Sequence, residues 1–197
     1  RLIGVGRDRV AVAEALAREI AHEPVYRGGP RGSIGRPHIL AIGDAQAPLS
    51  KFFEILDRHS ALGSDGRLRE DVHLVSIGDH FDWGTRAGRD QAATDGLALL
   101  AWLSAHAADR TTLILGNHDL ARVGELAAFD DATFREAQAA ADALAQGAEA
   151  AFLARFLALP TAEAATRDLA TFREPQRTLV ASLLRARRYS ASAATGA

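Results

Sequence analysis

The sequence predicts an α/β fold built on a parallel sheet, and three observations favour this class. Short apolar runs bounded by glycine occur at residues 38–42, 72–77 and 111–115, and such runs are typical of buried parallel strands. Each run ends at a glycine that is followed at once by Asp44, Asp79 or Asn117. Helical patterns separate the runs, and the order strand–helix–strand–helix–strand implies parallel strands with right-handed crossovers.

The elements around the first run have recognisable ends. A helix is predicted over residues 8–22, with Asp8 as its cap and one apolar face made by Val12, Leu16 and Ile20. A loop rich in glycine and arginine follows at residues 27–37. The first strand then begins at His38.

Two helices are expected between the strands. The first covers residues 48–62, because Pro48 suits a first helical turn and Gly63 suits a helix end. Its expected buried residues are Leu49, Phe52, Phe53 and Leu56. The second covers residues 90–107, and its apolar positions are Leu97, Leu100 and Leu103.

The chain changes character after Asn117. Alanine-rich helices are predicted at residues 131–146 and 148–157, and residues 171–174 have the form of a capping box that opens a last helix through Arg188. No strand is evident after Leu115, so the sheet looks unfinished, and the last residues, 190–197, look frayed. We expect one domain over residues 1–197, incomplete at its C-terminus, with residues 131–189 as a helical insertion or cap.

Composition narrows the class of function. The chain of 197 residues is 48% hydrophobic and 24% charged, which suits one globular domain with a core. The net charge of −2 provides no field for nucleic acid or an anionic membrane. No run approaches the length of a membrane-spanning helix, so we expect a cytoplasmic protein. The absence of Cys excludes disulfides and thiolate chemistry.

The polar residues after the strands are suited to metal binding. Asp79 is the strongest candidate, because a carboxylate can bridge two cations and two-metal hydrolases hold their ions about 3.5–4 Å apart. Asp44 would bind one ion, and Gln46 projects to the same side of an extended chain with an amide oxygen that hard cations accept. Asn117 would give its amide oxygen to the second ion. The alternative is that these residues are turn formers and helix caps.

His118 and Asp82 are the predicted catalytic pair. His118 follows a proposed ligand and is expected to face the substrate, where an imidazolium stabilises phosphate charge or donates a proton to the leaving oxygen. Asp82 lies in the loop of Asp79 and could orient and charge the imidazole. The alternative is a surface histidine and a loop-capping aspartate.

Several other polar residues near this edge of the predicted sheet have more than one possible role. Asp119 is expected to hold its loop by hydrogen bonds rather than to bind metal. His38 and His80 are weighed as contacts to substrate or metal, and Trp83 either walls the pocket or packs under the loop. Arginine is the usual phosphate clamp, but it is frequent throughout this chain. The candidate clamps are Arg86, Arg89 and Arg122.

Two of these motifs carry a resemblance to a known family. Residues 78–84, Gly-Asp-His-Phe-Asp-Trp-Gly, and residues 116–119, Gly-Asn-His-Asp, resemble the second and third signatures of the calcineurin-like metallophosphoesterase superfamily. Asp44-Ala45-Gln46 resembles the first signature, normally Asp-x-His. The resemblance covers residues 39–119.

The resemblance implies an αββα sandwich and a dinuclear centre of manganese, iron or zinc. It also implies that a metal-bound hydroxide hydrolyses phosphate esters, as in bacterial metal-dependent phosphatases. By position, it implies Asp44, Asp79 and Asn117 as metal ligands, and His118 with Asp82 as the acid pair.

Three departures from the family pattern stand out. Gln46 replaces the usual His, and a neutral amide binds transition metals more weakly than imidazole. Trp83 stands where the protein-phosphatase branch has Arg. The family supplies two further histidines downstream, whereas this chain has no His after His118. Since it also has no Met, we expect the N-terminal part of a longer phosphoesterase, with one ion as the alternative to two.

Several functions stay open at this point. The leading hypothesis is a metal-dependent phosphoesterase acting on a phosphorylated small molecule, a nucleotide or a phosphoprotein. The first alternative is a non-catalytic metallophosphoesterase-like binding module. The second is a nucleotide-binding α/β protein without hydrolysis, suggested only by the Gly-Val-Gly of residues 4–6.

Overall fold

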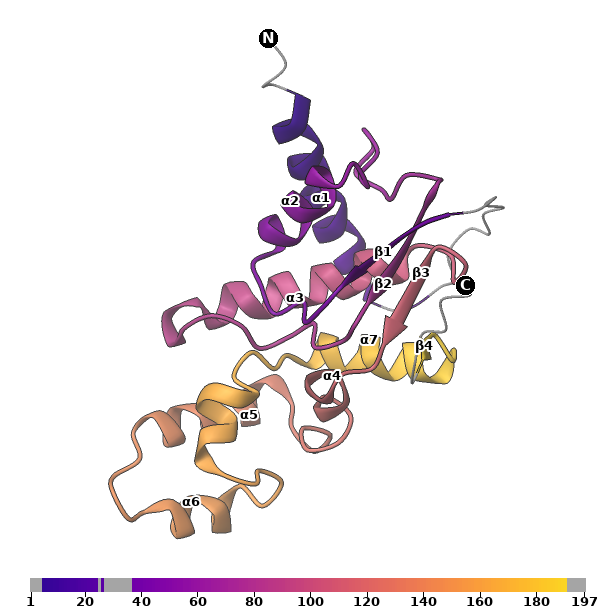
Figure 1. Ribbon diagram of the computed structural model, residues 1–197. Helices are drawn as coiled ribbons and strands as arrows, with labels where there is room; N and C mark the ends of the chain where they lie inside the picture. The colour runs from indigo at the N-terminus through magenta and orange to yellow at the C-terminus, as the bar shows by residue number, and fades with distance from the viewer. Residues whose placement is uncertain (1–4, 25, 27–36, 191–197) are drawn as a thin grey trace.

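The computed structural model describes residues 5–24, 26 and 37–190, and its centre is a four-stranded sheet in the order β1-β2-β3-β4 (Figure 1). All three strand pairings are parallel. The strands are β1 (His38–Ile42), β2 (Val72–Ser76), β3 (Thr111–Ile114) and β4 (Tyr189–Ser190). The predicted α/β class with a parallel sheet is therefore confirmed.

Four helices pack together in the main core: α1 (Val5–Ala21), α2 (Leu49–Arg58), α3 (Arg89–Ser104) and α7 (Glu174–Arg185). Leu40, Leu74 and Thr111 align across the sheet, and this face turns toward the helices. Phe53 and Trp102 meet edge to face, with ring centroids 5.0 Å apart. All four residues predicted to be buried on α2 are buried.

The sheet is completed differently from the prediction. The expectation that no strand follows Leu115 is wrong, because Tyr189 and Ser190 pair with Leu113 and Ile114 of β3. A two-residue strand is too short to leave an apolar pattern in the sequence. The first run is also less buried than expected for a buried parallel strand. Its strand, β1, pairs with β2 alone in the described sheet, and Ile39 stays 43% exposed.

Helix ends and faces differ in detail. The helix predicted from residue 8 already begins at Val5, and its buried positions are Ala13 and Ala17, whereas Val12 is 39% exposed. The Ala13 backbone also lies against Gly66, where an added Cβ would stand 2.8 Å from it. The helix predicted over residues 48–62 ends at Arg58, before Gly63.

A second hydrophobic cluster lies away from the sheet (Figure 1). It involves α4 (Asn117–Ala121), α5 (Asp131–Asp142), α6 (Glu149–Arg155) and a one-turn π-helix, Ala164–Asp168. Its centre contains Phe134 and Phe172, with ring centroids 5.1 Å apart. The predicted insertion at residues 131–189 is divided between the two cores, because α7 belongs to the main core and contacts α3 there. Its status as a separate cap stays a prediction.

The last helix begins later than its predicted cap. It starts at Glu174, where the Arg173 backbone N–H donates to the Gln176 Oε1 atom, rather than at the capping box proposed for residues 171–174. It ends at Arg185, before Arg188. No helix in the described part of the chain is long and apolar enough to span a membrane. Gly4, most of the loop at residues 27–37 and the end at residues 191–197 lie outside the described residues.

Candidate active site at the carboxyl ends of the strands

Hydrogen bonds join the loops that follow the first three strands. The Ile77 N–H donates to the Ile42 carbonyl at 3.0 Å, and the Ala45 N–H donates to the Gly78 carbonyl at 3.5 Å. The His118 N–H donates to the Asp79 Oδ1 atom at 2.9 Å. The structure therefore brings the loops of Asp44, Asp79 and Asn117 to one edge of the sheet, as parallel strands require.

The loop after β2 holds an unusual backbone. Gly78 and Gly84 have φ angles of 83° and 86°, and two residues with side chains, Asp79 and Asp82, have φ angles of 51° and 65°. Such angles are uncommon for residues other than glycine, and they persist where surrounding contacts compensate their cost. The two carboxylates predicted to act are thus the strained residues of this loop.

The buried pair of Asp119 and His80 holds the loop after β2 in place through hydrogen bonds. The Asp119 carboxylate accepts from the backbone N–H groups of Asp79 and Gly116, both at 3.1 Å, and contacts His80 Nδ1 at 3.0 Å. His80 Nε2 lies 2.9 Å from the Ser76 hydroxyl. Burial raises the pKa of Asp119, but His80 and the backbone N–H groups outweigh it and hold that pKa below its usual range. Asp119 holds the loop, as expected, and His80 is structural because it is fully buried.

His118 and Asp82 contact each other directly. His118 Nδ1 lies 2.9 Å from Asp82 Oδ2, and the two side chains are 20% and 0% exposed. This hydrogen bond raises the pKa of His118 despite partial burial. Since Asp82 occupies Nδ1, the Nε2 nitrogen is the one available to a substrate.

Two further residues enclose the Asp82 carboxylate. Arg122 donates from both Nη atoms, at 2.8 and 2.9 Å, and Thr171 donates from its hydroxyl at 2.7 Å and from its backbone N–H at 3.0 Å. Burial raises the pKa of Asp82, but the Arg122 charge and the hydrogen bonds from His118, Arg122 and Thr171 lower it to about 2. Asp82 is therefore an anion at neutral pH and well below it.

The sequence did not reveal these two partners. Arg122, a candidate phosphate clamp, is fully buried and binds Asp82 instead. Its spacing of four residues from His118 was the available signal, because residues i and i+4 share a helix face. Thr171 gave no such signal, since it lies 89 residues from Asp82 in the chain.

A comparison with models of known protein families shows the family to which the chain belongs. The family model for calcineurin-like phosphoesterases matches residues 37–173. The chain belongs to this family. The match includes every predicted site residue and also Thr171. No curated protein and no solved structure matches the chain.

Membership in the calcineurin-like phosphoesterase family points to metal-dependent hydrolysis of phosphoesters. The predicted ligands are the two carboxylates of Asp44 and Asp79 and the two amides of Gln46 and Asn117. Within the described residues, no group of three or more His, Cys, Asp or Glu side chains gathers as a metal site. Gln46 Nε2 donates to the Phe81 carbonyl at 2.9 Å, which leaves its amide oxygen free of that bond. A set made only of oxygen donors fits a hard divalent cation.

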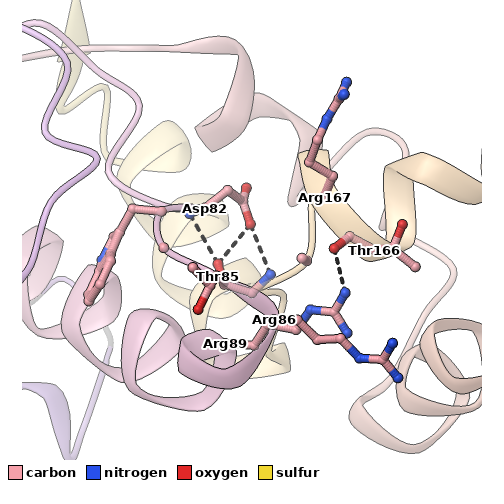
Figure 2. Close-up of a pocket in the computed structure, with 10 residues that line it drawn as sticks. Asp82, Thr85, Arg86, Arg89, Thr166 and Arg167 are labelled. Carbon is pink, nitrogen blue, oxygen red and sulfur yellow. Dashed lines mark hydrogen bonds between the residues drawn. The ribbon is translucent and has the colours of Figure 1, made fainter. Parts of the chain in front are cut away.

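A cavity of about 230 Å³ lies beside Asp82 in this calcineurin-like phosphoesterase (Figure 2). Trp83 lines it, which is one of the two roles considered for that residue. Arg89 reaches Thr166 and Asp142 and is mostly buried, so it joins segments of the fold. Arg86 also pairs with Asp142, at 3.1 Å, but stays 68% exposed.

His38 lies outside this arrangement. It is the first residue of β1, whereas the site follows the last residue of that strand. The interpretation of His38 as a residue near the site is therefore wrong, because a parallel strand carries its two ends to opposite edges of the sheet.

Proposed function

We propose that this chain hydrolyses phosphate monoesters in a metal-dependent reaction, with His118 as the proton donor to the leaving oxygen. The contact of 2.9 Å between His118 Nδ1 and Asp82 Oδ2 carries the proposal. It leaves Nε2 available at the edge of the sheet where the proposed ligands follow their strands. Proton transfer by a positioned histidine of this kind contributes about 10²–10⁴-fold to the rate of the reaction.

Each residue has a defined part in the proposal. Asp44, Gln46, Asp79 and Asn117 would hold one or two divalent ions, with manganese, iron and zinc as the candidates. When bound, such ions supply Lewis-acid activation of water and neutralise phosphate charge. His118 holds a proton at Nε2, and Asp82 stabilises the imidazolium and fixes its ring plane. The backbone N–H of His118 orients Asp79 through the Oδ1 atom.

The size of the cavity beside Asp82 favours a small substrate. Its volume of about 230 Å³ is smaller than the ~300–1,000 Å³ of drug-sized ligand sites, so it suits the organic part of a phosphorylated small molecule. Arg86 and Arg167 line it and are largely exposed, so they can approach anionic groups of the substrate. A phosphoprotein would have to present its side chain to the same cavity.

Hydrolysis of para-nitrophenyl phosphate by the full chain tests the proposal. The protein is treated with a chelator and then supplied with manganese, iron or zinc. We expect activity to require a metal and to fall about 100-fold in His118→Asn. His22→Asn is the matched control, because His22 is exposed just beyond α1, and it should keep full activity. Hydrolysis that survives chelation, or equal rates in wild type and His118→Asn, would contradict the proposal.

One observation favours a second candidate, a metallophosphoesterase-like binding module without catalysis. The Gln46 amide is a weaker ligand for transition metals than imidazole, and its N–H group is already engaged by Phe81. Calorimetric binding of manganese together with no hydrolysis of the aryl phosphate would support this module instead.

A further inference from the structure

Three residues contact the Asp82 carboxylate, and each of its two oxygens has a different set of partners. Oδ2 meets His118 Nδ1 and Arg122 Nη1, whereas Oδ1 accepts from Arg122 Nη2 and from both donors of Thr171. Asp82 also returns a bond, since its backbone N–H donates to the Thr171 hydroxyl at 3.1 Å. The contacts therefore define the plane of the carboxylate as well as its position.

We propose that Arg122 and Thr171 are positioning residues for His118, which they control by fixing the Asp82 carboxylate. The inference rests on the proposed function, in which His118 transfers the proton. The left-handed backbone of Asp82 supports it, because such a backbone is maintained by surrounding contacts rather than by local preference.

Other buried residues hold Arg122 and Thr171 in place. Arg122 Nε donates to Gln176 Oε1 at 3.0 Å, and the guanidinium lies 4.6 Å from the centre of the Phe81 ring. Gln176 Nε2 in turn donates to the carbonyls of Thr171 and Ala93, at 2.9 and 3.0 Å. Arg122 and Gln176 are fully buried, so these bonds are shielded from competing water.

This network connects distant parts of the chain. Asp82 belongs to the loop after β2, Arg122 follows α4, and Thr171 precedes α7. The segment before α7 therefore contributes to the geometry of the catalytic pair. We expect it to act on the rate of the chemical step and not on substrate affinity.

The first test compares two buried threonines. Thr171→Val removes the hydroxyl that binds Asp82, and Thr111→Val is the control because Thr111 is equally buried and its hydroxyl binds the Leu103 carbonyl on another face of the fold. We expect Thr171→Val to lower kcat for para-nitrophenyl phosphate about tenfold, as loss of a charged hydrogen bond does, and KM to stay within about twofold. Thr171→Ser, which keeps the hydroxyl, should restore kcat.

A second measurement works without hydrolysis. In the metal-free chain, the ring Nδ1 proton of His118 should give a hydrogen-bonded resonance in the proton NMR spectrum, assigned by its loss in His118→Asn. We expect that resonance to persist in Thr111→Val and to broaden or disappear in Thr171→Val. Arg122→Lys, which keeps the charge but loses the paired contact, should have the same effect, with Arg188→Lys as the matched buried control.

The two readouts separate the inference from the proposed function. Absence of hydrolysis in wild type would reject the function, while the NMR comparison would still decide the positioning of the ring. An unchanged His118 resonance in folded Thr171→Val and Arg122→Lys would overturn the inference. Equal losses of kcat in Thr171→Val and Thr111→Val would overturn it too, because they would reflect general destabilisation. Circular dichroism establishes that each variant is folded, and Arg122→Lys serves alone if Thr171→Val unfolds.

Discussion

Gly116 lies directly against Asp79: a Cβ atom on Gly116 would stand 2.1 Å from Asp79 Oδ1 and 2.4 Å from the Asp79 backbone nitrogen. Gly78 faces the same contact, because its own Cβ would be 2.6 Å from the Gly116 nitrogen. The loops after β2 and β3 thus touch through their glycines. This contact brings the Asp79 carboxylate to the start of α4, where His118 follows.

Gly116→Ala should therefore displace Asp79. Backbone and carboxylate atoms cannot yield to the new methyl group without a shift, and overpacking of this kind costs about 1–3 kcal/mol. Calorimetry should show weaker manganese binding, and urea unfolding should show lower stability. Gly43→Ala is the matched control, since a Cβ there meets nothing within 4 Å. Equal metal affinity and stability in the two variants would refute the contact.

Asp82→Asn should destabilise the fold strongly. Arg122 and Asp82 are both fully buried, and removing one member leaves a buried charge without its partner, which costs about 3–5 kcal/mol. The measurement is the free energy of unfolding in urea. Asp71→Asn is the control, because Asp71 pairs with Arg69 on the exposed surface, and it should leave the unfolding midpoint unchanged. A similar small effect of both substitutions would show that Arg122 finds another partner.

The burial of His106 leads us to expect that the free energy of unfolding depends on pH. Burial lowers the pKa of His106 from 6.5 to about 4, and its ring accepts from the Leu68 N–H at 3.1 Å. The unfolded chain binds the proton below about pH 6.5, whereas the folded chain resists it until about pH 4. The stabilisation is therefore complete above pH 6.5, decreases as the pH falls, and is lost by about pH 4.

The expected loss through this pH range is about 3 kcal/mol, since each pKa unit corresponds to about 1.4 kcal/mol. Urea unfolding at several pH values measures it. His106→Gln should flatten the curve between pH 6.5 and 4, because glutamine does not titrate. The low pKa of Asp82 affects stability only below about pH 4 and does not overlap. Parallel curves for wild type and His106→Gln would exclude His106 as the source.

Local patterns explain how much of the fold could be predicted. The positions of β1, β2 and β3 followed from short apolar runs, and their loops followed from the glycines at the strand ends. The buried face of α1 did not, because Ala13 and Ala17 are small residues with a weak apolar signal. The strand at Tyr189 depends on β3 for its pairing and has no signal of its own.

The candidate site could also be predicted only in part from the sequence. The proximity of Asp82 and His118 could be predicted, since both lie next to motifs that identify strand ends. The enclosure of Asp82 could not, because the Thr171 bond joins residues 89 positions apart. Arg122 has a local signal, but a charged residue at that spacing suits a solvent-exposed helix face as well as a buried pair. Only tertiary structure distinguishes these cases.

Gln46→His tests whether this position limits metal binding. The substitution creates the Asp-x-His form of the first family signature, in which imidazole replaces an amide as the ligand. Imidazole is the better ligand for zinc and other transition metals, whereas magnesium prefers oxygen donors. We therefore expect zinc affinity, measured by calorimetry, to rise at least about tenfold, while magnesium affinity stays equal or falls. Ala47→His is the control for an added histidine one residue further on, where the Ala47 N–H closes a tight turn on the Ala45 carbonyl. Equal gains in zinc affinity for both variants would mean that Gln46 does not face the metal.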